Sequence, residues 1–261
     1  MDHKIIERLS KIEKYNKIHI LYACDSGSHT WGVSSTSSDF DVRFIYVHPM
    51  EHYLKIDDMK NDVVESPITE GIELVGWDLR KSLRLLRKSN PTLLEWLNTD
   101  IIYYENEKFS QHMKKMSQDC FSNKATLHHY VNMASRNYKP LYENAATIKQ
   151  YLNVLRPLLM CMWIYEHNKF PSTLSIPLLV DMLINEKKEN KHLNKIIHEL
   201  INNKQHNKKM LESIYSDDLN NFFEEQITFH KQFVQSLPKM TKPMYHTSQL
   251  DHFFRFVLNE I

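Results

Sequence analysis

One stretch near the N-terminus constrains the fold of this chain more than any other. An apolar run, Ile18–Cys24, leads into Gly27 and Ser28, and a second apolar run starts at Asp39 and Asp41. Short apolar runs bounded by glycine and serine are typical of buried strands. Side chains alternate between the two faces of a strand, so Asp39 and Asp41 point to the same face. The stretch therefore predicts two strands, a Gly-Ser turn after the first, and a carboxylate pair on the second.

These residue types suit a divalent cation and phosphate groups. Mg²⁺ prefers a few carboxylate oxygens and completes its octahedron with waters and substrate phosphates. Asp39 and Asp41 supply carboxylates without filling that shell. Backbone N–H groups around Gly27 and the hydroxyl of Ser28 can hold phosphate oxygens. We therefore expect Mg²⁺ or Mn²⁺ to bind at the Asp39/Asp41 pair and phosphate oxygens to bind at the Gly27-Ser28 turn.

The order strand, Gly-Ser, glycine, Asp-x-Asp, strand resembles the DNA polymerase beta superfamily of nucleotidyltransferases. Three stretches resemble more closely the bacterial RNA repair pathway DNA polymerase beta family: SGSHTWGVSSTSSDFDVRFIY at 26–46, GWDLRK at 76–81 and LLRKSNPTLLEWL at 85–97. The dense resemblance covers residues 20–103, and a thinner one reaches about residue 165. It implies metal-dependent transfer of a nucleoside monophosphate from an NTP to an acceptor hydroxyl, with release of pyrophosphate. The family name points to RNA as the acceptor.

A site of this type uses a third carboxylate, which closes the metal cage and accepts the proton of the attacking hydroxyl. Glu73 and Asp78 lie on the third expected strand, and in an unbroken strand they face opposite sides. Asp78 precedes a helical pattern and suits an N-cap, whereas Glu73 matches the position of the third acid in related nucleotidyltransferases. We favour Glu73 as the third catalytic and metal-binding carboxylate; a bulge at Gly76 would reverse this choice.

Three other residues of the resembling stretches have open interpretations. Arg43 is expected on the strand face opposite the aspartate pair, as a sheet-packing ion pair or as a phosphate contact. Trp31 either stacks on a base or belongs to the core. Asp25 stands directly before Ser-Gly-Ser, where the family usually carries an acidic residue.

Hydrophobic periodicity divides the chain into a mixed head and a helical remainder. A helix is expected at 3–15, and strands near 18–24, 42–48 and 72–77, with a possible short strand near 61–65. Helical periodicity then begins at Leu79, and Pro91 opens a further helix. Later helices are expected at about 108–119, 125–137, 142–168, 174–186, 190–203, 206–214, 218–236 and 247–259.

This pattern predicts an α+β fold with two domains. We expect a polymerase-beta-like nucleotidyltransferase domain, a short mixed sheet with helices, at 1–110. We expect an all-helical domain at 111–261, which completes the cleft for the nucleotide and the acceptor.

One later helix carries the wording K-x-Y-x-x-x-x-R-P at Lys149, Tyr151, Arg156 and Pro157. Lys149 and Arg156 are seven residues apart, which is about two helical turns, so both can face one side. In the superfamily the helical domain often supplies a cation to the triphosphate and an aromatic side chain to the base. The resemblance therefore implies that Lys149 and Arg156 bind the nucleotide; the alternative is two surface charges on a long helix.

Composition narrows the class of protein. The net charge is +1, so any surface for nucleic acid must be local. The basic run at 186–209 is one candidate, with a pair of solvated helices as the alternative. Cys24, Cys120 and Cys161 are far apart, which is typical of a reduced protein without a zinc site. The chain lacks ~18 consecutive apolar residues, so we expect a soluble, cytoplasmic protein without a membrane partner.

Three functions remain open at this point. The first is nucleotidyl transfer to RNA, the second is the same chemistry on a protein or a small molecule, and the third is a non-catalytic nucleotide- or RNA-binding module. The presence of both the Gly27-Ser28 turn and the Asp39/Asp41 pair argues against the third.

Overall fold

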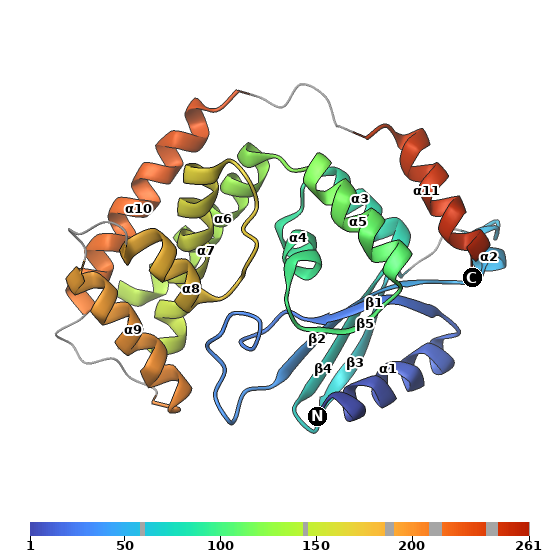
Figure 1. Ribbon diagram of the computed structural model, residues 1–261, viewed down its shortest axis with the longest axis horizontal. Coiled ribbons are helices and arrows are strands. Elements are labelled where there is room, and N and C mark those ends of the chain that lie inside the picture. The colour runs from blue at the N-terminus through green and yellow to red at the C-terminus, as the bar shows by residue number, and fades with distance from the viewer. Residues whose placement is uncertain (58–60, 143–145, 186–190, 209–215, 239–244, 261) are drawn as a thin grey trace. The chain divides into compact units, whose positions relative to one another are not determined.

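The computed structural model describes residues 1–57, 61–142, 146–185, 191–208, 216–238 and 245–260. They form two compact units (Figure 1). Unit 1 comprises Met1–Thr30, Asp39–Cys120 and Lys242–Ile261, and unit 2 comprises Trp31–Ser38 and Phe121–Thr241. Strands and helices mix in unit 1, and the predicted α+β class is confirmed.

Unit 1 is built on a sheet that, among the described residues, has five strands in the order β3-β4-β2-β1-β5. β2 and β4 are parallel, and the other neighbouring strands are antiparallel. The predicted strands, including the short one near 61–65, are confirmed, whereas β5 is a short edge strand without an expected counterpart. The strands are β1 (His19–Asp25), β2 (Phe40–Val47), β3 (Val63–Thr69), β4 (Ile72–Asp78) and β5 (Ile102–Glu105).

Different helices cover the two faces of this sheet (Figure 1). On one face Ile5 of helix α1 shares an apolar cluster with Phe44 of β2, and on the other Ile45 shares a cluster with the remaining helices of unit 1. Since side chains alternate along a strand, Asp41 lies on the same face as Ile45. The helices of unit 1 are α1 (Asp2–Asn16), α2 (Met50–Tyr53), α3 (Leu79–Arg87), α4 (Pro91–Asn98), α5 (Glu107–Asp119) and α11 (Thr247–Glu260).

Unit 2 is helical and is organised around α7 (Ile148–His167), most of which is buried. α7 starts later than the predicted residue 142 because a capping box sets its first turn: Thr147 Oγ1 accepts from Gln150 N at 3.3 Å, and Gln150 Oε1 accepts from Thr147 N at 2.7 Å. Pro157 lies inside the helix. The other elements are α6 (Asn123–Tyr138), η1 (Lys139–Tyr142), α8 (Ile176–Val180), the π-helical turn η2 (Asp181–Asn185), α9 (Lys191–Gln205) and α10 (Ser216–Ser236).

The loop after β1 contributes to the core of unit 2. Trp31 is 2% exposed within the helical cluster, and its carbonyl accepts a hydrogen bond from Ile176 N at 2.9 Å. Gln205 Nε2 donates to Gly32 O at 3.1 Å. Of the two interpretations of Trp31, the structure shows the core residue.

The compact units differ from the two continuous segments expected at 1–110 and 111–261. Phe109 of α5 and Phe253 of α11 are buried in the same cluster as the sheet, so both helices belong to unit 1. An amphipathic helix has the same apolar period wherever it packs, so periodicity alone does not assign it to a unit.

Two expected features lie partly outside the described part of the chain. Most of the helix expected at 206–214 lies outside it, and so do residues 186–190 and 209 of the basic run. Within the described ranges, no helix is long and apolar enough to cross a membrane.

Candidate active site

The parallel pairing of β2 and β4 brings two of the predicted carboxylates together. Asp41 and Glu73 are paired residues in this register, which runs without a shift from Phe40–Ile72 to Tyr46–Asp78. Paired residues of neighbouring strands point to the same face. The two carboxylates therefore lie side by side on the sheet, and both are partly buried.

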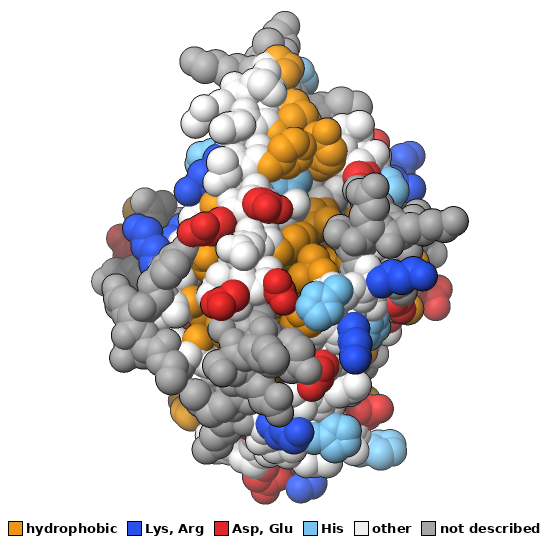
Figure 2. Space-filling view, turned by 90° about the vertical axis from the view of Figure 1, so that its left-hand side faces the viewer, with side chains coloured by type: hydrophobic (Ala, Val, Ile, Leu, Met, Phe, Trp, Pro, Cys, Tyr) orange, Lys and Arg blue, Asp and Glu red, His pale blue; other side chains and the backbone are white. Residues whose placement is uncertain are grey.

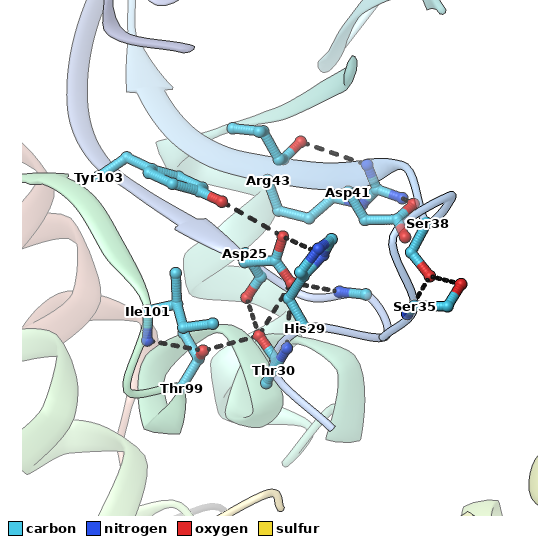
Figure 3. Close-up of polar contacts among 12 residues, drawn as sticks. Asp25, His29, Thr30, Ser35, Ser38, Asp41, Arg43, Thr99, Ile101 and Tyr103 are labelled. Atoms are coloured by element: carbon cyan, nitrogen blue, oxygen red, sulfur yellow. Dashed lines mark hydrogen bonds and ion pairs between the residues drawn. The ribbon is translucent and has the colours of Figure 1, made fainter. Parts of the chain in front are cut away.

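Arg43 lies between these carboxylates. Its Nη2 is 3.2 Å from Asp41 Oδ1 (Figure 3). The same nitrogen is 2.6 Å from Glu73 Oε2. The expectation that Arg43 lies on the opposite face is therefore wrong: it stands two residues after Asp41, and a strand returns to the same face every second residue. The ion-pair interpretation of Arg43 is the one found.

The electrostatics of Asp41 reflect this crowded environment. Burial raises its pKa most, the Arg43 guanidinium lowers it, and the charges of Glu73 and Asp25 raise it. Acidic groups brought together and partly removed from water need a cation to stay ionised. In this structure the Arg43 guanidinium supplies part of that charge, and the pKa of Asp41 is still raised above its usual value.

Asp39 precedes β2 and is exposed. The start of β2 is held by Phe40 N, which donates to Gly71 O at 2.8 Å, and a Cβ on Gly71 would lie 3.3 Å from Asp39 Oδ1. Among the described residues, no three His, Cys, Asp or Glu side chains are placed to hold one metal ion. The structure thus pairs Asp41 with Glu73 and leaves Asp39 at the turn joining β3 to β4.

Asp78 has a different environment from Glu73. It is buried on the opposite face and caps α3, with Oδ1 accepting from Arg80 N at 2.7 Å and Oδ2 accepting from Tyr53 Oη at 2.6 Å. The predicted N-cap is confirmed. β4 pairs with β2 through Gly76 without a bulge; a Cβ there would lie 2.1 Å from the Phe44 ring. The alternative that depended on a bulge at Gly76 is therefore not found.

Asp25 organises the Gly-Ser turn, and the sequence showed only that an acid stands there. Its side chain is fully buried. Oδ1 accepts from Gly27 N at 2.9 Å, Thr30 N at 3.3 Å and Thr30 Oγ1 at 3.1 Å, and Oδ2 accepts from Tyr103 Oη at 3.3 Å (Figure 3). An aspartate that accepts from the N–H two residues on is a turn-forming signal, so this role could have been expected from the sequence.

Gly27 lets the turn lie directly against Asp41. A Cβ at Gly27 would lie 2.1 Å from Asp41 Oδ2, and Ser26 N donates to Asp41 O at 3.0 Å. The Gly27 N–H is already donated to Asp25, so Gly27 itself offers no free donor to phosphate, whereas Ser28 carries a backbone N–H and a hydroxyl. The Ser28 side chain is partly buried and has no hydrogen-bond partner within the described ranges.

The chain matches the RNA repair pathway DNA polymerase beta family over residues 1–256. The chain belongs to this family. It is 38% identical to the uncharacterized protein YcgL of Bacillus subtilis (strain 168) over 262 residues, an alignment that covers 100% of this chain and 96% of YcgL. It also resembles the crystal structure of a nucleotidyltransferase-like protein from Exiguobacterium sibiricum 255-15, with 14% identity, a TM-score of 0.32, and coverage of 90% of this chain and 75% of that one.

Membership of the RNA repair pathway DNA polymerase beta family supports a nucleotidyltransferase of the polymerase beta type. The donor set fits a divalent cation, because Asp41 and Glu73 already share one positive group, the Arg43 guanidinium. Mg²⁺ takes such carboxylate oxygens and leaves positions for phosphates.

Lys149 and Arg156 belong to α7 in unit 2. Lys149 is exposed, whereas Arg156 is partly buried, with its guanidinium 4.8 Å from the centre of the Trp31 ring. Tyr151 is 4% exposed in the helical core, 6.1 Å from the ring of Phe223, which does not suit stacking on a base. Nucleotide binding by Lys149 and Arg156 stays a prediction.

Proposed function

We propose that this protein transfers a nucleoside monophosphate from an NTP to a hydroxyl group of RNA, with release of pyrophosphate. The observation that carries the proposal is the Asp41–Glu73 pair on β2 and β4, with the Gly27 turn packed against Asp41. Carboxylates beside a phosphate-binding turn are the parts that such a transfer needs. Family membership supports the same chemistry.

Asp39, Asp41 and Glu73 would hold the metal. Mg²⁺ or Mn²⁺ there would lower the pKa of the acceptor hydroxyl and neutralise phosphate charge. Asp39 is exposed at the start of β2, so its side chain can turn toward Asp41 without leaving a packed core. Glu73 is the carboxylate we assign to accept the hydroxyl proton.

The turn would hold the phosphates. Ser28 offers its N–H and hydroxyl, while Asp25 and Thr30 keep the turn in shape through their hydrogen bonds. The missing Cβ of Gly27 keeps this turn next to Asp41. Lys149 and Arg156 of α7 are the cations we propose for the triphosphate.

The acceptor is tested directly with labelled nucleotide. Purified protein is incubated with Mg²⁺ or Mn²⁺, each α-labelled NTP in turn, and a mixture of cellular RNA and protein, and the products are separated on a denaturing gel. We expect label on RNA, with one NTP preferred. Label only on protein, or only on a small molecule, would contradict RNA as the acceptor while keeping the transfer chemistry.

Two variants show whether the signal comes from this site. Asp41→Asn keeps the shape of the side chain and removes its charge, so we expect the label to disappear. Asp251→Asn makes the same change on the exposed surface of α11 and should leave labelling unchanged. Equal labelling by wild type and Asp41→Asn would contradict the proposal.

A further inference from the structure

A cavity of about 500 Å³ lies within unit 2, between α7, α9 and α10. Its floor is apolar and includes Met162, Leu183 and Phe222, all of which are buried. Figure 2 views the side on which α9 and α10 lie in Figure 1, and it shows acidic side chains beside a strip of hydrophobic ones. A cavity with an apolar floor and a few polar groups is the usual form of a small-molecule site.

Apart from two histidines, the ionisable groups that the structure describes at this cavity are acidic. Glu166 of α7 and Asp218 and Glu225 of α10 line it, and the lining residues that the structure describes include no lysine or arginine. Besides the buried His230, only His192 among these lining residues can become a cation. Its Nε2 is 3.2 Å from Asp218 Oδ2. Such a field attracts cations and repels phosphate.

Aromatic rings form part of the cavity wall. Tyr165 and Phe229 meet edge to face with their centroids 5.0 Å apart, and they are 40% and 43% exposed. Aromatic faces attract ammonium groups and also cover methylene chains. The wall therefore suits a ligand that is both cationic and partly apolar.

His230 provides an independent sign of a ligand. The side chain lines the cavity and is 1% exposed, and neither ring nitrogen has a hydrogen-bond partner within the described ranges. Burial lowers its pKa to about 4, so the ring is neutral at pH 7 and one nitrogen can accept a hydrogen bond. Buried polar atoms normally have partners, and an N–H donor in the cavity would provide one.

The spacing of the carboxylates indicates the length of the ligand. Asp218 and Glu225 are seven residues apart on α10, which corresponds to roughly 10 Å along a helix. We propose that this cavity binds a linear polyamine. Its ammonium groups lie near Asp218 and Glu225, its methylene groups cover Tyr165 and Phe229, and one N–H is donated to His230.

Calorimetric titration of the full chain with spermine tests the proposal. We expect saturable binding of one spermine per chain, weakened by added salt because the attraction is partly between exposed charges. A diamine with a three-carbon chain cannot reach both carboxylates and should bind at least about tenfold more weakly. Absence of saturable binding at low salt, or equal affinity for the two amines, would overturn the proposal.

Matched variants locate the binding. Glu225→Gln removes one carboxylate from the cavity and should weaken spermine about tenfold, and His230→Phe should also weaken it by removing the acceptor. Glu199→Gln makes the same change in charge on α9, outside the residues that line the cavity, and should not alter binding. Equal effects of Glu225→Gln and Glu199→Gln would show diffuse attraction to net charge and overturn the proposal.

Discussion

Single residues set the geometry of the candidate site, and Gly27 does so through the side chain that it lacks. In Gly27→Ala the new Cβ would have to displace the carboxylate of Asp41, which lies 2.1 Å from it. We expect a loss of stability of about 1–3 kcal/mol, typical of overpacking, together with loss of nucleotidyl transfer. Urea denaturation and labelled transfer measure the two effects.

Gly76→Ala is the matched control for that variant. Its Cβ would also lie 2.1 Å from another atom, but this atom belongs to the Phe44 ring on the opposite face of the sheet. We expect a similar loss of stability with normal transfer per folded molecule. Equal loss of transfer in both variants would show that activity depends on overall stability and not on the position of the Asp41 carboxylate.

Arg43 competes with a metal ion for the same two carboxylates. Arg43→Met removes the bridging guanidinium, so the metal-free protein should lose about 1–3 kcal/mol of stability. Mn²⁺ should then raise the melting temperature more than in the wild type, because a ligand of the folded state stabilises it in proportion to its affinity. Melting curves with and without Mn²⁺ measure this.

Lys81→Met is the control for Arg43→Met, since it breaks a partly buried pair with Asp62, at 2.8 Å, away from the carboxylate pair. Its response to Mn²⁺ should equal that of the wild type. A metal site at Asp41 and Glu73 would be contradicted if Mn²⁺ raised the melting temperature of Arg43→Met no more than that of Lys81→Met.

His230 should make the stability of the protein depend on pH. Its pKa is lowered to about 4 in the folded protein, whereas an unfolded histidine titrates near 6.5. Below about pH 6.5 the unfolded state binds the extra proton, so stability falls as the pH falls toward 4. From pH 7 to pH 5 this group accounts for a loss of about 2 kcal/mol.

His230→Phe should abolish that part of the pH dependence. Urea denaturation of both proteins at pH 7 and pH 5 measures the difference, with His128→Phe, an exposed change on α6, as the control. If His230→Phe and wild type lose the same stability between pH 7 and pH 5, His230 is not a source of the pH dependence.

Sequence patterns predict the role of a residue when that role depends on the alternation of a strand or on the cap of a helix. Glu73 and Asp78 could be told apart because a strand alternates faces and an aspartate before a helix is a cap. The same alternation, applied correctly, would have placed Arg43 beside Asp41. The contact between Gly27 and the Asp41 side chain depends on how β1 and β2 pair, and no local pattern contains it.

At the level of elements, the packing of α11 against the sheet can be tested, because it decides whether this helix belongs to unit 1. Phe253 is 7% exposed in the cluster that covers the sheet, whereas Phe256 of the same helix is 39% exposed. Phe253→Ala should cost about 3–5 kcal/mol, as buried aromatic residues do, and Phe256→Ala should cost clearly less. Urea denaturation compares them, and equal losses would contradict the packing of α11 in unit 1.

The elements themselves were largely predictable, but their partners were not. α7 was expected from its apolar run and was found six residues later, where the Thr147 capping box starts it. β5 has four residues and lies at the edge of the sheet, so it carries little periodicity. Which helices join the sheet depends on contacts between distant parts of the chain.

At the scale of the whole molecule, the chain forms two compact units, and its family match over residues 1–256 supports a nucleotidyltransferase of the polymerase beta type. The candidate metal-binding carboxylates and the phosphate-binding turn all belong to unit 1. The central claim is that transfer takes place on the sheet face that carries Asp41 and Glu73.

The most direct test compares Glu73→Gln with Asp78→Asn in the labelled-nucleotide assay. Both remove one carboxylate charge from β4, and asparagine can still cap α3. We predict that Glu73→Gln loses at least about 100-fold in transfer, the order expected when a group that binds metal or accepts the proton is removed, while folded Asp78→Asn stays active. Normal transfer by Glu73→Gln, or loss of transfer only in Asp78→Asn, would contradict this account.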